Sequence, residues 1–329
     1  MKRFSLLISI VLLFIIGCSS EGASNSEETK NLKPVTFVLD WTPNTNHTGI
    51  YVAQSEGFFE EEGLDVEIIM PGEAGAGQLV ATGKADLGIN YQEGLMMARD
   101  RDLPLVSVGA VIQHNTAGYA SPVEKNIVDP VDFEGKVYGA SMSDLAKAIM
   151  KTSMEENGAD FSKVKSTNIG ESDFFVAVER DIDFSLVFQG WTGIEAEIRG
   201  QELNMIYLKD LTEGLDFYTP IIATSEKMIS EDPETVEKFM RAAVKGYEFA
   251  IEKPEEAADI LIKSVPDLDA ELVMESQKWL ATKYQDDAPE FGVQEAERWE
   301  SVKEFMVEHD LIDPEFDINK AFTNEFITK

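Results

Sequence analysis

The chain has 329 residues, of which 43% are hydrophobic, a length that predicts two globular lobes with real cores and excludes a small disulfide-stapled module. Its 61 acidic and 28 basic residues give a formal charge of −33, and a surface this negative repels phosphate backbones, so we expect no nucleic-acid partner. The single cysteine, Cys18, excludes intramolecular disulfides and clusters of thiolates.

The first eighteen residues have the pattern of a secretion signal. Two basic residues precede an apolar run over residues 4–16, which ends at Gly17-Cys18. The run is too short to span about 30 Å of hydrocarbon, which indicates a signal peptide rather than a permanent membrane helix. The order Ile15-Ile16-Gly17-Cys18 resembles the lipobox of bacterial lipoproteins, although leucine is commoner in the place of Ile15. We expect Cys18 to be lipidated; the alternative is an ordinary secretory signal with an incidental thiol.

The rest of the chain alternates between strand-like and helix-like segments. Residues 19–33 are polar and predict a flexible tether. Several expected strands are nearly all apolar, as strands buried on both faces of a parallel sheet are, and helical stretches lie between them, which predicts an α/β fold. The clearest helix begins at Pro233 and stops at Pro254. The expected strands are Val35–Leu39, Asp65–Met70, Leu87–Asn90, Pro104–Ile112, Lys136–Ala140, Lys165–Ile169, Phe184–Gln189, Met205–Leu208 and Pro220–Ser225.

Two stretches have the composition of crossings between lobes. Proline, glycine and aspartate residues mark Asn115–Asp132, and a Tyr-Thr-Pro step opens Tyr218–Ser225. A chain that leaves one α/β lobe, builds a second and returns needs two crossings. We therefore expect residues 34–115 and 225–329 to form lobe 1, and residues 116–224 to form lobe 2.

The loop at residues 40–49, directly after the first expected strand, is the most informative candidate site. Ligands of open α/β sheets bind beyond the carboxyl ends of strands, and this loop places Trp41, Asn44 and His47 there. An aromatic face beside amide and imidazole groups suits a small polar ligand. Ordinary turn chemistry also produces loops rich in proline and asparagine, so both interpretations stay open at this point.

Two further clusters follow strands. Trp191 has glycines at 190 and 193, which would free its ring to face a cleft, and Glu195 stands at the start of the next helix. The alternatives are a core tryptophan and a carboxylate that only favours the helix dipole. Tyr91 and Glu93 follow the strand at Leu87–Asn90, and we expect them to point to opposite sides of the chain.

The sequence contains no motif for metal binding or for nucleophilic catalysis. His47, His114 and His309 are far apart in sequence, and no histidine or cysteine cluster has the spacing of a metal site. No Gly-x-Ser-x-Gly elbow occurs, and nothing nominates a catalytic nucleophile. We expect no metal, no cofactor and no catalytic residue.

The run from Val35 to Ala53 (VTFVLDWTPNTNHTGIYVA), with further matches at Ala81–Gly88 and Gly190–Glu195, resembles the solute-binding lipoproteins of bacterial ABC importers. Among these, the chain is most similar to the thiamine-precursor group, which binds formylaminopyrimidine. The resemblance covers about residues 35–310. Riboflavin-precursor, nitrate, sulfonate and taurine binders share the fold and remain alternatives for the ligand.

The resemblance implies a two-lobed type II periplasmic-binding-protein fold that closes on its ligand at a hinge. It implies an ABC-transporter permease as partner and a lipid-anchored location on the extracytoplasmic face of the cell membrane. Trp41 and Trp191 would sandwich a flat pyrimidine, Asn44 would bond to its edge, and Glu195 would meet its amino-amidine edge. Related fungal pyrimidine synthases carry a cysteine-rich stretch, which this chain lacks, so we expect a binding protein rather than a pyrimidine-processing enzyme.

Overall fold

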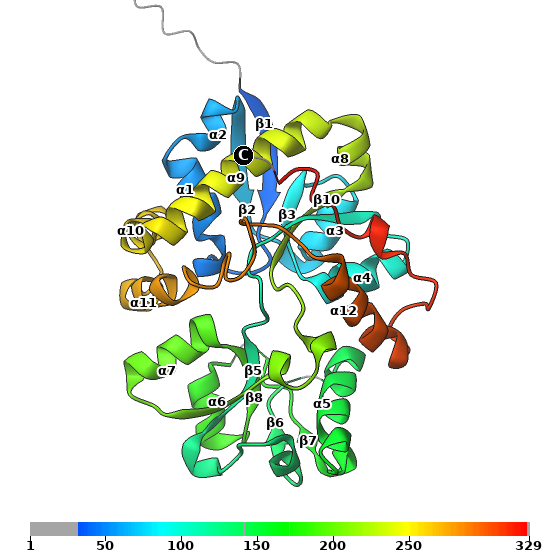
Figure 1. Cartoon of the computed structure of the whole chain (residues 1–329). Coiled ribbons are helices and arrows are strands. Elements are labelled where there is room, and N and C mark those ends of the chain that lie inside the picture. The colour runs from blue at the N-terminus through cyan, green and yellow to red at the C-terminus, as the bar shows by residue number, and fades with distance from the viewer. Residues whose placement is uncertain (1–31, 141, 171, 328–329) are drawn as a thin grey trace, which may run out of the picture. The chain divides into compact units, whose positions relative to one another are not determined.

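A computed structural model describes residues 32–140, 142–170 and 172–327. The expected signal peptide, the expected lipidation site Cys18 and most of the expected tether lie outside these residues. Residues Leu32–Lys329 form one compact unit, in which the chain builds two separate main sheets (Figure 1).

The first sheet has five strands in the order β2-β1-β3-β10-β4. β1 pairs in parallel with β2 and β3, whereas β10 runs antiparallel to both β3 and β4. The sheet is therefore mixed rather than purely parallel. Its strands are β1 (Lys33–Val38), β2 (Leu64–Ile69), β3 (Leu87–Asn90), β4 (Leu105–Ala110) and β10 (Ile221–Ser225).

Both faces of the first sheet are buried, which explains why its strands read as apolar runs. Neighbouring residues of β10 belong to different core clusters, Ile222 to one and Ile221 and Ala223 to the other. Phe37 of β1 stacks on Phe239 with ring centroids 5.2 Å apart. The cluster around Phe37 is supplied by α1 (Thr48–Ser55), α9 (Pro233–Glu252), α10 (Pro254–Ser264) and α11 (Ala270–Leu280). On the other face pack α3 (Ala76–Ala81), α4 (Gln92–Asp100) and α12 (Ala296–Glu308) (Figure 1).

The second sheet has three strands in the order β8-β5-β9, all antiparallel. Its centre is β5 (Ala117–Pro122), flanked by β8 (Ser185–Phe188) and β9 (Leu203–Tyr207). A short parallel pair, β6 (Val137–Tyr138) with β7 (Lys165–Ser166), lies beside it.

The twelve helices of the described residues connect these strands and cover the sheets. α9 is the longest and begins at Pro233, as the sequence predicts, and the proline at 254 opens the next helix. The helices are α1 (Thr48–Ser55), α2 (Phe58–Glu61), α3 (Ala76–Ala81), α4 (Gln92–Asp100), α5 (Asp144–Glu156), α6 (Phe174–Arg180), α7 (Ile194–Arg199), α8 (Glu226–Glu231), α9 (Pro233–Glu252), α10 (Pro254–Ser264), α11 (Ala270–Leu280) and α12 (Ala296–Glu308).

The expected crossings need correction. β5 lies inside the stretch 115–132, and β10 lies inside 218–225 and belongs to the first sheet, although the expected boundary assigned residues up to 224 to lobe 2. The segments that link the two sheets are shorter, at residues 111–116 and 216–220. The division into two lobes is a proposal that we keep with these revised links.

Candidate functional site

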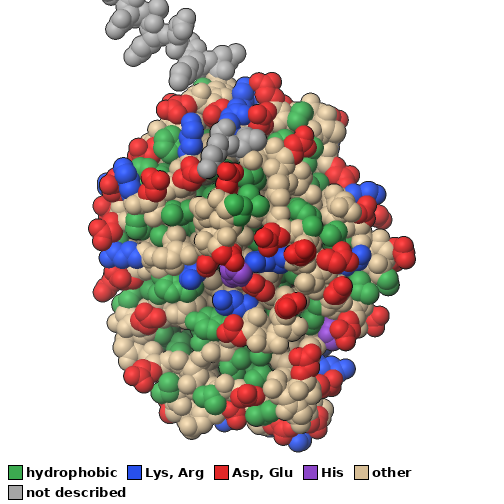
Figure 2. All heavy atoms as spheres, viewed as in Figure 1, with side chains coloured by type: hydrophobic (Ala, Val, Ile, Leu, Met, Phe, Trp, Pro, Cys, Tyr) green, Lys and Arg blue, Asp and Glu red, His purple; other side chains and the backbone are tan. Residues whose placement is uncertain are grey.

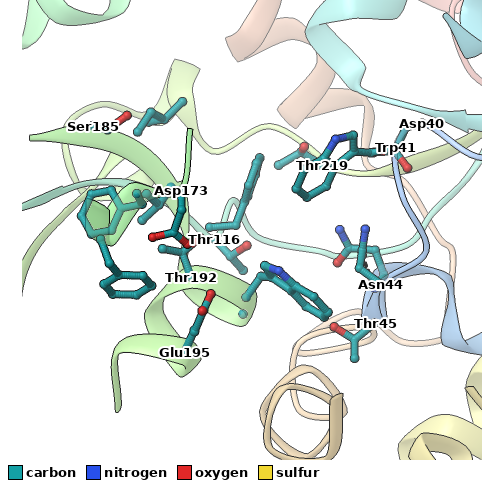
Figure 3. Close-up of a pocket in the computed structure, with 18 of the residues that line it drawn as sticks. Asp40, Trp41, Asn44, Thr45, Thr116, Asp173, Ser185, Thr192, Glu195 and Thr219 are labelled. Carbon is teal, nitrogen blue, oxygen red and sulfur yellow. Dashed lines mark hydrogen bonds between the residues drawn. The ribbon is translucent and has the colours of Figure 1, made fainter. Parts of the chain in front are cut away.

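A cleft of about 470 Å³ lies where the ends of the first-sheet strands meet the second sheet and its helices. Figure 3 shows Asp40, Trp41, Asn44 and Thr45 on one side, with Asp173, Thr192 and Glu195 on the other. Thr116 and Thr219, one from each linking segment, also line it. The described residues contain no group of three or more His, Cys, Asp or Glu side chains arranged to hold a metal ion.

Asp40 is the second residue after the end of β1, and its side chain is 7% exposed. Oδ1 accepts a hydrogen bond from Nε2 of His47 at 2.7 Å, and Oδ2 accepts one from the hydroxyl of Tyr91. Burial raises the pKa of Asp40, but the hydrogen bonds from His47 and Tyr91 lower it below its ordinary value. Asp40 is therefore an ionised group in the wall of the cleft.

His47 does not line the cleft. Its ring is fully buried, and Nδ1 accepts a hydrogen bond from the backbone N–H of Asn44 at 3.2 Å, which closes a capping box around the turn Thr45–His47. The expectation that His47 contacts ligand is therefore not kept. The imidazole acts behind the cleft, where it joins Asp40 to the loop that carries Asn44.

Asn44 lines the cleft, but its amide is largely committed to its own loop. Oδ1 accepts from the backbone N–H of Asn46 at 2.9 Å, and Nδ2 donates to the carbonyl of Thr42 at 3.0 Å. The same oxygen also accepts from the backbone N–H of His47 in the capping box, so one amide proton stays available to a ligand. Trp41, three residues earlier, also lines the cleft and is 52% exposed, so its ring face is open.

Tyr91 and Glu93 differ in their relation to the cleft. Tyr91 lines the cleft, whereas Glu93 does not. Glu93 lies in the first turn of α4, its Oε2 is buried without a hydrogen-bond partner, and burial raises its pKa to about 7. Hydrogen bonds from the backbone N–H groups of Glu93 and Gly94 oppose that rise. Glu93 thus occupies the amino end of α4. We therefore no longer propose that it contacts the ligand directly.

Trp191 lies in a single π-helical turn, Gln189–Gly193, between β8 and α7. Its ring lines the cleft and also packs against the core cluster of the first sheet. The glycine at 190 allows this approach, because a Cβ there would lie 3.0 Å from the side chain of Leu280. Ser276 of α11 donates to the Gly190 carbonyl, so α11 fixes the turn that presents the indole.

Glu195 lines the cleft from the first turn of α7, with its side chain 23% exposed. Oε1 pairs with the guanidinium of Arg199 one turn later, and the same guanidinium lies 3.8 Å from Asp173. Arg199 also lies over the ring of Phe175, 4.2 Å from its centroid. One cation therefore serves two carboxylates at this side of the cleft.

The cleft residues that sequence reasoning did not select fall into two kinds. Asp40 and Thr45 belong to the informative loop, but a carboxylate and a hydroxyl beside tryptophan gave no separate signal. Asp173 and Phe174 come from a segment that carried no motif, whereas the other residues of the apolar wall lie in expected strands and were not selected as ligand contacts. That wall consists of Ile169, Phe174, Leu186 and Phe188.

Comparisons with known structures identify the fold. The periplasmic aliphatic sulphonate binding protein of Escherichia coli superimposes with a TM-score of 0.68, covering 90% of this chain and 99% of that one at 14% identity. This similarity confirms the expected periplasmic-binding-protein fold. At such low identity it carries no information on the ligand.

Comparisons of sequence place the chain in a family. It is 30% identical to the formylaminopyrimidine-binding protein of Halalkalibacterium halodurans, over 98% of this chain and 99% of that protein. It is 26% identical to the 4-amino-5-hydroxymethyl-2-methylpyrimidine phosphate synthase of Legionella pneumophila, over 89% of this chain and 92% of that enzyme. Residues 44–257 match the family described as NMT1/THI5 like. The chain belongs to the NMT1/THI5-like family.

Proposed function

We propose that this protein is the extracytoplasmic solute-binding component of an ABC importer, which captures a pyrimidine precursor of thiamine such as formylaminopyrimidine and delivers it to the membrane permease. The observation that carries the proposal is a cleft with two tryptophans, Trp41 and Trp191, and three carboxylates. Flat aromatic faces suit a heteroaromatic ring. The relative that binds formylaminopyrimidine supports the choice of ligand.

The charge of the cleft favours a neutral or weakly basic ligand over an anion. Asp40, Asp173 and Glu195 line it, and the described lining residues include no lysine or arginine. Anion sites use arginine or the free amino end of a helix, but Glu93 occupies the first turn of α4 beside the cleft residue Tyr91. Acidic side chains are also spread widely over the face in Figure 2. Sulfonate, taurine and nitrate therefore fit poorly.

We propose that the ligand is bound and released unchanged, although relatives of the family include synthases. The only cysteine of the chain is Cys18, so the cleft contains no thiol. The hydroxyl of Thr45, one of several that line the cleft, bonds to Ser276, and the hydroxyl that bonds to a carboxylate is the phenol of Tyr91, a group that burial keeps protonated. The measurement that tests this point is mass spectrometry of the ligand recovered after prolonged incubation with the protein, in which any change of mass contradicts the proposal.

Membrane attachment is proposed to rest on lipidated Cys18, with residues 19–33 as the tether. Among the described residues, no helix is both long and apolar enough to cross a membrane. One acyl chain holds a protein only marginally, so stable attachment requires a diacylglyceryl group or a second anchor. Cys18→Ser should move the protein from the membrane fraction to the medium. A variant that stays membrane-bound and uncleaved refutes the anchor.

The ligand is tested by calorimetry of the full chain against formylaminopyrimidine, riboflavin, taurine, nitrate and an alkanesulfonate. We expect the pyrimidine to bind most tightly. Native mass spectrometry of protein purified from its own cells should show a retained mass equal to that ligand. Tighter binding of riboflavin or of any anion in the panel contradicts the pyrimidine assignment and leaves the importer role in place.

A further inference from the structure

The hydrogen-bond polarity of the first-sheet side of the cleft follows from where its protons are committed. The groups concerned are Asp40, Tyr91 and Thr45, all of which line the cleft; Asn44 lies on the same side and keeps one amide proton of its own. Each hydroxyl has one proton to donate, and a carboxylate has none when ionised. Once the partner of each proton is known, what remains for a ligand is determined.

The charge of Asp40 is not neutralised by its histidine partner. Nδ1 of His47 accepts from the backbone N–H of Asn44 at 3.2 Å, so Nδ1 carries no proton. The proton lies on Nε2 and is donated to Asp40 at 2.7 Å, which makes the imidazole neutral. Among the described residues, no lysine or arginine forms an ion pair with Asp40. The other ionisable neighbours, Tyr91 and Tyr247, are phenols whose pKa is raised mainly by burial and further by the charge of Asp40, so they stay protonated.

Tyr91 gives its only proton to Asp40. Burial raises the pKa of the phenol far above its ordinary value, and the charge of Asp40 raises it further, so the hydroxyl keeps that proton. The hydrogen bond from the hydroxyl to Oδ2 of Asp40 then uses it. The Tyr91 oxygen retains only lone pairs for the cleft.

The hydroxyl of Thr45 also has no proton left for a ligand, because of two linked hydrogen bonds. The Ser276 hydroxyl donates its proton to the Gly190 carbonyl. In the 2.6 Å contact between the hydroxyls of Thr45 and Ser276, Thr45 must therefore be the donor. Its oxygen is also left with lone pairs only.

We propose that Asp40, Tyr91 and Thr45 form an acceptor-only wall, with Asp40 as the specificity-determining residue, which selects ligands that present hydrogen-bond donors along one edge. The fitting chemistry is an aromatic amine, an amidinium or a protonated ring nitrogen. A ring carbonyl placed against these three groups would bring its oxygen close to other acceptor oxygens. No proton would lie between them, and a buried acceptor without a hydrogen-bond donor is unfavourable. This inference deepens the proposed function and rests on it for the identity of the pyrimidine.

The test compares two ligand pairs by calorimetry on the full chain. The first pair is 4-amino-5-hydroxymethyl-2-methylpyrimidine and its 4-oxo counterpart, and the second is benzamidine and benzamide. The native protein should prefer the amino or amidine member of a pair by at least about tenfold. In Asp40→Asn, the amide oxygen can keep the bond from His47 while the NH₂ donates to the Tyr91 oxygen, which frees the phenol proton for the cleft. We expect the preference to fall at least tenfold and the oxo member to bind as well as before or better.

Two further variants make the result specific. Asp86→Asn is the matched control, because Asp86 precedes β3 at the end away from Tyr91 and accepts from the backbone N–H of Thr36 at 2.8 Å; it should keep the native preference. Tyr91→Phe removes one acceptor, so the amino members should lose several-fold in affinity with no change for the oxo members. This variant decides the matter if Asp40→Asn does not fold.

The outcomes separate the wall from the proposed function. If Asp40→Asn or Tyr91→Phe weakens both members of a pair equally, the wall is overturned and these residues only position the loop. If the native protein ignores the pyrimidines but prefers benzamidine in an Asp40-dependent way, the pyrimidine assignment fails and the wall stands. No preference in either pair overturns the wall, whatever the affinity.

Discussion

Nδ1 of His114 lies 2.6 Å from Oδ2 of Asp216 and joins the two segments that link the sheets. The other ring nitrogen, Nε2, lies 3.1 Å from Asp287 in the loop after α11, and Arg298 of α12 lies 3.8 Å from Asp216. The hydrogen bond with Asp216 raises the pKa of His114 above its ordinary value. A titratable cluster therefore lies where the chain passes twice between the sheets.

His114→Gln should cost stability in a pH-dependent way. Because the folded-state pKa is raised, the charged pair stabilises fully below the unfolded value near 6.5 and loses its effect as pH rises through the folded value. For this partly exposed pair we expect a loss on the order of 1 kcal/mol, or about 2–4 °C in melting temperature, at pH 5.5. Thermal melts at pH 5.5 and 9 measure it. A difference that is equal at both pH values contradicts the charged pair.

Glu93→Gln should stabilise the protein at high pH. The folded pKa of about 7 lies above the unfolded value, so Glu93 favours folding below about pH 4.5 and costs stability as pH rises through 7. Glutamine keeps the shape without the charge, and we expect a gain of about 1–3 kcal/mol at pH 8.5 and little change at pH 4.5. Chemical denaturation at both pH values tests this. A loss of stability at pH 8.5 would show that the ionised carboxylate is needed at the helix end.

Gly246→Ala should be strongly destabilising. α1 and α9 pack so closely that a Cβ at 246 would overlap the backbone of Gly49, and a Cβ at 49 would overlap the ring of Tyr247. Overpacking of this kind costs about 1–3 kcal/mol or more. Gly94→Ala in α4 is the matched control, since its nearest neighbour would be 3.4 Å away, and it should gain a few tenths of a kcal/mol from helix propensity. Equal melting temperatures for the two variants would contradict the close packing.

The sequence predicted nine of the ten strands of the described residues and missed β5, which has no apolar or β-branched run. β1, β3 and β10 carry β-branched residues between turn signals, and their expected ranges agree with the structure within a few residues. β5 consists of Ala-Gly-Tyr-Ala-Ser-Pro, whose small residues resemble a linker. Glycine at 118 is required there, because a Cβ would crowd Met205 on β9. Packing between strands, which local sequence does not encode, makes this segment the central strand.

The candidate site shows the same limit. The loop motif after β1 predicted Trp41 and Asn44 in the cleft, because the end of a parallel strand points to a binding edge. The sequence could not show that His47 turns away from the cleft to bond with Asp40. It also could not bring Asp173 beside Glu195, since the shared partner Arg199 becomes visible only when α6 and α7 pack together. Their roles toward ligand stay predictions.

Trp41→Ala and Trp191→Ala should separate binding from stability. Stacking of each indole on an aromatic ligand contributes about 0.5–1.5 kcal/mol beyond area burial, so each variant should lose roughly twofold to tenfold or more in affinity. Trp41 is 52% exposed, so its loss should leave the melting temperature nearly unchanged. Trp191 packs on the first-sheet core, and its loss should also cost about 1–3 kcal/mol of stability.

The matched control for the tryptophans is Met70→Ala, which removes an apolar side chain that is 48% exposed and does not line the cleft. It should change neither affinity nor stability appreciably. Calorimetry and thermal melts on the three variants provide the comparison. If both tryptophan variants bind as tightly as the native protein and only melt earlier, the indoles are core residues.

Glu195→Gln should weaken binding of an aminopyrimidine and spare an anion. Oε1 of Glu195 pairs with Arg199, which leaves Oε2 to accept from an exocyclic amine or a protonated ring nitrogen. Glutamine places an NH₂ where an acceptor is needed, and an unsatisfied buried group costs about 1–3 kcal/mol, or roughly tenfold to a hundredfold in affinity. A sulfonate should bind the variant as well as the native protein or better, because one negative charge has been removed. Calorimetry of the variant with an aminopyrimidine and with a sulfonate tests this prediction. If the aminopyrimidine affinity is unchanged, Glu195 does not contact the ligand edge and only pairs with Arg199 at the start of α7.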